Sequence, residues 1–136
     1  MADKSAELAR VPLFADVGRR QLGKLAERFR ERRVSAGTTP VEEGKMSGVG
    51  FFVVAEGEAA VSVGGKLVAT LGPGSHFGEV ALITEAERTA TVTATTDLRL
   101  LEIPFYDFRD FAHENPDVMW KLLQHVVATR YGDVQP

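Results

Sequence analysis

Short apolar runs separated by glycines fill the middle of the chain, from residue 34 to residue 103. Residues 61–63, 91–93 and 98–100 alternate between apolar and polar or charged side chains, which is the period of half-buried strands. The pair Gly64-Gly65 separates two such runs and is a signal for a two-residue hairpin turn. Many short strands joined by regular turns predict a β-sandwich or β-roll.

Helical patterns flank this strand-rich middle. Apolar residues recur at helical spacing in the N-terminal segment, at Leu22, Leu25, Ala26 and Phe29. After Pro104 the sequence predicts a short helix over 105–114, and Asn115-Pro116-Asp117 begins another that runs to about Arg130. The chain therefore divides into a helical segment at 1–33, a strand-rich middle at 34–103 and a helical end at 104–131.

Composition narrows the class of protein. A chain of 136 residues fits one domain, here residues 1–136. The formal net charge of −3 does not favour nucleic acid, and the absence of cysteine excludes disulfides and thiolate metal sites. Neither a signal peptide nor a run long enough for a membrane helix is present, so we expect a cytoplasmic protein with no membrane partner.

Arg88 is the feature that most directly suggests a ligand. It is the only arginine between Val34 and Leu98, a stretch with eight acidic residues. A guanidinium group binds phosphate through two parallel N–H bonds. The sequence Gly-Glu-Val-Ala-Leu at 78–82 is suited to open one helical turn, whose free N–H groups favour the same anion. Glu79 can accept hydrogen bonds from sugar hydroxyls, so the pattern predicts a site for an anionic sugar.

Residues 78–92 resemble the phosphate-binding cassette of cyclic nucleotide-binding domains, which reads approximately Gly-Glu-x-Ala-Leu, a short variable stretch, and Arg-Ser/Thr/Ala-Ala. Gly78 and Arg88 stand ten positions apart, a common spacing in that family. The turn at 71–78 also resembles the family, and the likeness extends from about residue 13 to about residue 127. It implies a mainly β fold with flanking helices, a jelly-roll-like β-roll (double-stranded β-helix) that binds cAMP or cGMP.

The resemblance implies a role for each cassette residue. Arg88 would bind the cyclic phosphate, Glu79 the ribose 2′-hydroxyl, and Gly78 would allow close approach of the backbone. The N–H of Ala81 would donate to the phosphate, and Thr89 would add a hydroxyl near phosphate or base. The expected ligand-binding residues are Gly78, Glu79, Val80, Ala81, Arg88, Thr89 and Ala90. Expected contacts to the base are Val61, Val68, Phe77 and Leu123, the last as a lid residue.

The C-terminal helix has a wide apolar arc, made of Val118, Met119, Leu122, Leu123, Val126 and Val127. This arc is wider than one packing face needs. In the resembled family the helix is a mobile lid or a dimer seam that reports ligand occupancy to an effector. We expect the same here, with an unknown effector protein or a missing effector domain as partner and a homodimer through this helix as one arrangement. A permanently packed helix is the alternative.

The resemblance is to catabolite activators and to bacterial channel-like domains, but the chain ends without the helix-turn-helix of the former. No DNA-binding domain is therefore expected. Seven of the sixteen cations lie between Arg19 and Arg33. That stretch leaves phosphate-backbone binding as a minor alternative to a solvated helix face.

A surface ion pair, a metal site and an enzyme active site are the alternatives to a ligand-binding cassette. Arg88 alone would suit a surface ion pair with Glu85 or Glu87. A metal site at His76 would need more imidazoles nearby, and His113 and His125 both lie in the helical end, so we expect no metal. No nucleophile elbow or P-loop is present, and no catalytic residue is predicted.

Taken together, the residues and the resemblance predict a non-enzymatic regulatory module that binds cAMP in preference to cGMP. An interaction or scaffold domain with an empty pocket, or with a different phosphate ligand, is the alternative from another class.

Overall fold

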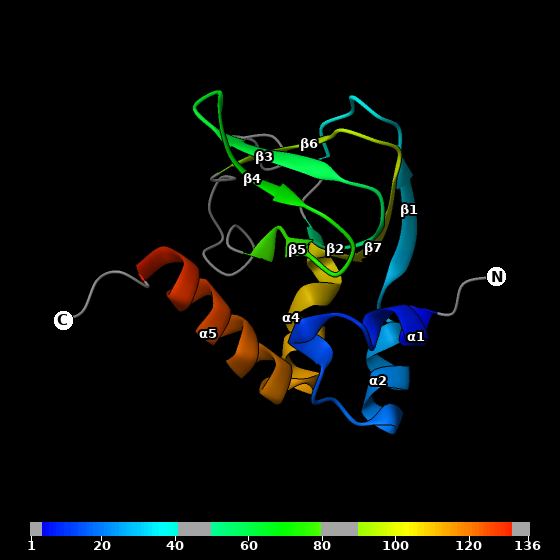
Figure 1. The fold of residues 1–136 in the computed structure, drawn as a ribbon. Coiled ribbons are helices and arrows are strands. Elements are labelled where there is room, and N and C mark those ends of the chain that lie inside the picture. Colours follow the sequence, from blue (N-terminus) through cyan, green and yellow to red (C-terminus); the bar gives the residue numbers. More distant parts are fainter. Residues whose placement is uncertain (1–3, 41–49, 80–89, 132–136) are drawn as a thin grey trace.

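The structure is a computed structural model and describes residues 4–40, 50–79 and 90–131 (Figure 1). Its helices are α1 (Lys4–Leu8), the 3-10 helix η1 (Pro12–Phe14), α2 (Arg19–Ala26), α4 (Phe105–Glu114) and α5 (Pro116–Tyr131). Its strands are β1 (Arg30–Val34), β2 (Gly50–Glu56), β3 (Ala59–Val63), β4 (Lys66–Leu71), β5 (His76–Phe77), β6 (Thr91–Ala94) and β7 (Leu98–Pro104). Within these ranges, no helix has both the length and the apolar character that a bilayer crossing requires.

The described strands form two antiparallel sheets. One sheet has the order β1-β7-β2-β5 and the other the order β4-β3-β6. The helices lie on the side of the four-stranded sheet that faces away from β3, β4 and β6 (Figure 1). The molecule thus consists of a helical layer and two sheet layers.

Alternation along β2 connects these layers. Phe51 and Val53 pack among the helices, whereas Phe52 and Val54 pack between the two sheets. Successive side chains of a strand point to opposite faces, so both faces of β2 are buried. This explains why β2 reads as a continuous apolar run rather than as an alternating one.

The turn between β3 and β4 confirms the predicted hairpin. Val63 pairs with Lys66, and the two residues between them are Gly64 at φ 58° and Gly65 at φ 79°. A two-residue turn whose twist matches that of the strands needs positive φ at both positions, and glycine adopts it without a Cβ clash.

The N-terminal helical segment ends earlier than predicted. Helix α2 stops at Ala26, and the residues from Arg30 onward belong to strand β1. The prediction of helix up to residue 33 was wrong because β1 pairs with β7, from Arg30 opposite Glu102 to Val34 opposite Leu98. The two predicted C-terminal helices are confirmed as α4 and α5.

Candidate functional site

The two ends of the predicted cassette are held by different sheets. Gly78 and Glu79 follow β5, which belongs to the four-stranded sheet, and the half-buried Ala90 precedes β6, which belongs to the three-stranded sheet. The segment between Glu79 and Ala90 therefore connects the two sheets. Val80, Ala81, Arg88 and Thr89 lie outside the described residues, and their roles stay predictions.

Gly78 has a backbone conformation that favours glycine. Its φ is +97°, in the left-handed region where a side chain causes strain. The chain can therefore turn sharply after Phe77, whose ring stacks on that of Phe52 at a centroid distance of 4.9 Å. The turn carries the next residue, Glu79, away from the core between the sheets.

Glu79 is a buried acid, with 8% of its surface exposed. Its Oε1 lies 3.4 Å from Nδ1 of His76, close enough for charge pairing but without hydrogen-bond alignment. Its Oε2 is buried and has no hydrogen-bond partner among the described residues. Burial by itself would raise the pKa of the Glu79 carboxyl, but the His76 imidazole, a backbone hydrogen bond and His125 together outweigh that effect, so the pKa is lowered. The carboxylate form is therefore the one prepared to accept further hydrogen bonds.

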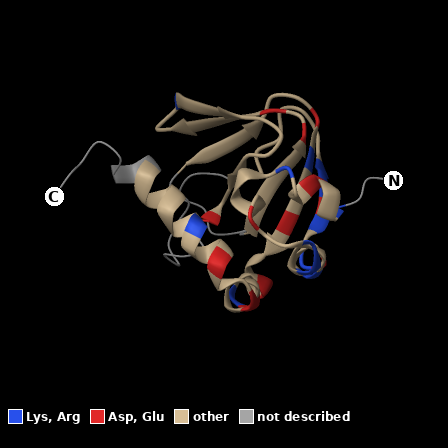
Figure 2. Cartoon of the chain, turned by 60° about the horizontal axis from the view of Figure 1, so that its bottom comes forward, with Lys and Arg blue, Asp and Glu red and all other residues tan. Residues whose placement is uncertain are grey.

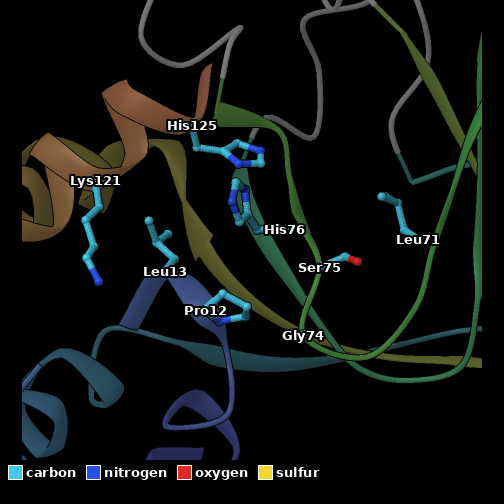
Figure 3. A pocket seen from close by; sticks show the side chains of 8 residues that line it. All are labelled: Pro12, Leu13, Leu71, Gly74, Ser75, His76, Lys121 and His125. Carbon is cyan, nitrogen blue, oxygen red and sulfur yellow. The ribbon is translucent and has the colours of Figure 1, made fainter. Parts of the chain in front are cut away.

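His125 of α5 has a ring nitrogen within 4.8 Å of a Glu79 carboxylate oxygen. Its ring lies edge-on to the ring of His76, at a centroid distance of 4.7 Å (Figure 3). Partial burial, followed by the charge of His76, lowers the pKa of the His125 imidazole. The expectation that no further imidazole lies near His76 was wrong for His125. Nothing in the sequence signals this contact, because it depends on where α5 crosses the sheet.

A cavity of about 360 Å³ lies beside this histidine pair. It is bounded by η1, the turn before β5 and α5, and Figure 3 shows its lining side chains. Lys121 lines it too and forms an ion pair with Asp16 at 2.6 Å. Of the predicted cassette residues that the structure describes, Gly78, Glu79 and Ala90 do not line this cavity, whereas His76, which neighbours Glu79, does.

The four predicted base contacts have different surroundings. Phe77 is 7% exposed and packs between the sheets, and Val61 packs against the same core. Val68 is 56% exposed on β4, at a position where the register between β3 and β4 skips a residue. Leu123 is 50% exposed on α5. Val68 and Leu123 thus keep surface that a ligand can cover, whereas Phe77 is committed to the core.

The basic stretch between Arg19 and Arg33 is split between α2 and β1, where lysine and arginine gather in Figure 2. Arg28 pairs with Glu114 at 2.6 Å, and Arg32 pairs with Glu102 at 3.5 Å. Part of the positive charge is therefore neutralised by acids of the same molecule, which weakens the case for a nucleic-acid surface.

The family model described as the cyclic nucleotide-binding domain matches residues 31–115. The chain belongs to this family. The match begins in β1, ends at Asn115 directly after α4, and includes the whole predicted cassette. The resemblance seen in the sequence is thereby confirmed.

This cyclic nucleotide-binding domain is similar in sequence to parts of a kinase regulatory subunit and of a channel. It is 42% identical over 95 residues to a cAMP-dependent protein kinase regulatory subunit of Yarrowia lipolytica, covering 68% of this chain and 25% of that protein. It is 38% identical over 111 residues to a cyclic nucleotide-gated potassium channel of Mesorhizobium japonicum, covering 82% of this chain and 30% of the channel. The chain therefore spans less than a third of either relative.

A solved structure confirms the fold class. The domain matches the catabolite activator protein of Thermus thermophilus with a TM-score of 0.81 and 28% identity, covering 90% of this chain and 60% of that one. The two antiparallel sheets with flanking helices are thus the β-roll of this family.

Proposed function

We propose that this domain binds a cyclic nucleotide, with cAMP favoured over cGMP, and that occupancy changes the position of α5 to signal to a partner protein. The observation that carries the proposal is the buried Glu79, directly after the left-handed Gly78, with a carboxylate oxygen that has no partner among residues 4–40, 50–79 and 90–131. A ribose hydroxyl would satisfy that oxygen. The names of the two relatives, a cAMP-dependent regulatory subunit and a cyclic nucleotide-gated channel, support the same ligand class.

Calorimetric titration with cAMP and with cGMP tests the ligand. We expect binding of both, with cAMP the tighter. Absence of binding heat with both nucleotides would instead favour a scaffold domain, and a cGMP preference above about a hundredfold would reverse the choice of ligand.

The variant Thr89→Ala tests whether the Thr89 hydroxyl contacts the base. One hydroxyl contact contributes about 0.5–1.5 kcal/mol, so the affinity ratio should move by about tenfold at most.

The position of α5 supports a role in signalling. Its His125 contacts His76, three residues before Glu79, so the helix lies against the same strand that positions the acid. Leu123 and Val127 remain about half exposed and Trp120 is 62% exposed. These side chains offer apolar surface for a ligand, an effector or a second copy of the chain. We propose that their exposure changes with ligand occupancy.

Pairs of spin labels can follow this helix because the chain has no cysteine of its own. Labels at Lys66→Cys and Gln124→Cys join the β3–β4 hairpin to α5, and both positions are exposed. We expect the distance between them to change on addition of cAMP. The control pair Lys66→Cys and Arg33→Cys joins two strands and should not change. An α5 distance that stays fixed at saturating cAMP would show that the helix is permanently packed.

A further inference from the structure

Three side chains with metal-ligating atoms converge where α5 passes β5. His76 lies in β5, Glu79 lies two residues after the end of β5, and His125 lies in α5. One ligand atom from each lies within 4.8 Å of the other two. Figure 3 shows the rings of the two histidines side by side at one end of the cavity.

The buried Glu79 and the half-buried His76 each have a buried atom without a partner among the described residues. The side chains of His76 and Glu79 are 9% and 10% exposed, and His76 Nδ1 and Glu79 Oε2 have no hydrogen-bond partner in the part of the chain that the structure describes. Buried polar atoms without partners are costly. A cation between the two side chains would give Nδ1 of His76 a partner and would bind the carboxylate of Glu79.

The distances suit a small tetrahedral ion. Nδ1 of His76 and Oε1 of Glu79 are 3.4 Å apart. Two ligands of a tetrahedral zinc ion, each about 2.1 Å from the metal, are also about 3.4 Å apart. The ligand atoms of the cluster lie within 4.8 Å of one another, so the most separated pair would approach by at most about 1.4 Å on binding. His125 is exposed on a helix surface and is the ligand best able to make that movement.

The donor set favours one class of metal. Two imidazoles and one carboxylate suit zinc and similar transition metals, whereas calcium and magnesium prefer sets of oxygen ligands. Lys121 lies one helical turn before His125, but its ammonium group is paired with Asp16 at 2.6 Å. Asp16 therefore compensates the positive charge of Lys121, which reduces its repulsion of a bound cation.

We propose that His76, Glu79 and His125 bind a zinc-class transition-metal ion, with a fourth position open to water. The ion would tie α5 to β5. It would also occupy the carboxylate that, under the proposed function, accepts the ribose hydroxyl, so metal and cyclic nucleotide would compete. This competition rests on the proposed function, whereas metal binding itself does not.

Metal binding is tested on the chain without a histidine tag, after treatment with a chelator and without nucleotide. Zn²⁺ is titrated by calorimetry and Co²⁺ by its visible absorption, which is intense for tetrahedral coordination. We expect one ion per chain. His125→Ala should lower the affinity by roughly tenfold or more, since even the loss of a residue that only orients a ligand has an effect of that size. The matched control is His113→Ala, an exposed helical histidine outside the cluster.

Absence of binding in the parent, or equal affinity in His125→Ala and the parent, would overturn the site. Because His125 is exposed, its variant should remain folded, which circular dichroism checks. Glu79→Gln should weaken Zn²⁺ binding as well, and unchanged affinity there would also contradict the proposal.

The competition is measured by titrating cAMP with and without saturating Zn²⁺. We expect weaker apparent cAMP affinity with the metal, and restoration in His125→Ala. Metal binding with unchanged cAMP affinity would overturn the competition. If the chain binds Zn²⁺ but neither nucleotide, the proposed function fails while the metal site stands.

Discussion

Glu79 shows at the scale of one residue how burial and chemistry combine. One carboxylate oxygen lies near His76, and the other has no partner in the part of the chain that the structure describes. A buried oxygen without a partner destabilises the fold relative to a satisfied one. A side chain that only filled space would be apolar here. This arrangement is the reason to test whether a ligand binds the acid.

Replacing Glu79 with glutamine tests that explanation on the ligand side. We expect cAMP binding to weaken by about 1.5–3 kcal/mol, the contribution of a hydrogen bond to a charged group. The parent should bind 2′-deoxy-cAMP poorly, and the variant should discriminate less between the two ligands. Calorimetric titration measures all four affinities. Equal discrimination by parent and variant would show that Glu79 does not contact the ribose.

Arg88→Ala tests the phosphate contact, a prediction that rests on the place of Arg88 in the sequence motif. Loss of the partner of a buried charge costs about 3–5 kcal/mol, so the affinity for cAMP should fall roughly 100- to 1,000-fold or more. Circular dichroism should stay native. Arg20→Ala, an exposed arginine on α2, is the control and should bind as the parent does. Unchanged affinity in Arg88→Ala would remove the central claim about the cassette.

At the scale of elements, a tight turn can require glycine, whereas the middle of a helix disfavours it. Gly57 and Gly23 illustrate these two cases. Gly57 lies between β2 and β3 with φ +94°, and a Cβ there would be 2.3 Å from the carbonyl oxygen of Asp97. Gly23 is exposed within α2, with nothing within 4 Å of an added Cβ.

These two sites predict opposite effects of the same substitution. Gly57→Ala should lower the free energy of unfolding by about 1–3 kcal/mol or more because both strain and clash oppose it. Gly23→Ala should raise it by about 0.5–1 kcal/mol because alanine is the better helix former. Urea unfolding measures both. A stabilised Gly57→Ala variant would show that this turn has another conformation.

The ion pair between Arg28 and Glu114 joins the segment after α2 to the end of α4. Hydrogen bonding to the Arg28 guanidinium holds the pKa of the Glu114 carboxyl below its usual value. A lowered folded-state pKa contributes stability above the unfolded-state value, and that contribution is lost as the pH falls through the folded-state value.

Glu114→Gln should therefore reduce the acid sensitivity of the fold slightly. We expect parent and variant to differ in urea midpoint near neutral pH and to converge below about pH 4. Salt should reduce the difference because the pair is exposed. A difference that grows on acidification would contradict this assignment.

The aromatic core unites the whole molecule. The ring of Phe29 contacts Phe14 of η1, Phe51 of β2 and Phe111 of α4, at centroid distances of 6.1, 6.2 and 5.9 Å. It therefore joins segments from the start, the middle and the end of the chain.

Phe29→Ala should lower the free energy of unfolding by about 3–5 kcal/mol, since it removes a fully buried ring and leaves a cavity. Phe105→Ala is the matched control, because Phe105 is 61% exposed and its loss should change stability by about 0.5 kcal/mol or less. Urea unfolding of both variants decides the matter. Similar losses at the two sites would mean that Phe29 does not hold the helical layer to the sheet.

The sequence by itself determined the local features of this protein. The strands at residues 61–63 and 98–100, the Gly64-Gly65 turn and the helix after Asn115 were all predictable. Each follows from side-chain period, from the positive φ that glycine permits, or from a proline at the start of a helix. The cassette motif, read the same way, indicated the family and the candidate ligand residues.

Only the tertiary structure decided what depends on segments distant in sequence. Arg30 to Val34 form a strand because β7 supplies their hydrogen-bond partners, although their sequence does not alternate. Glu79 is buried and His125 meets His76 because α5 lies against β5. Pairing and convergence of this kind arise from the packing of one element on another, which no local pattern encodes.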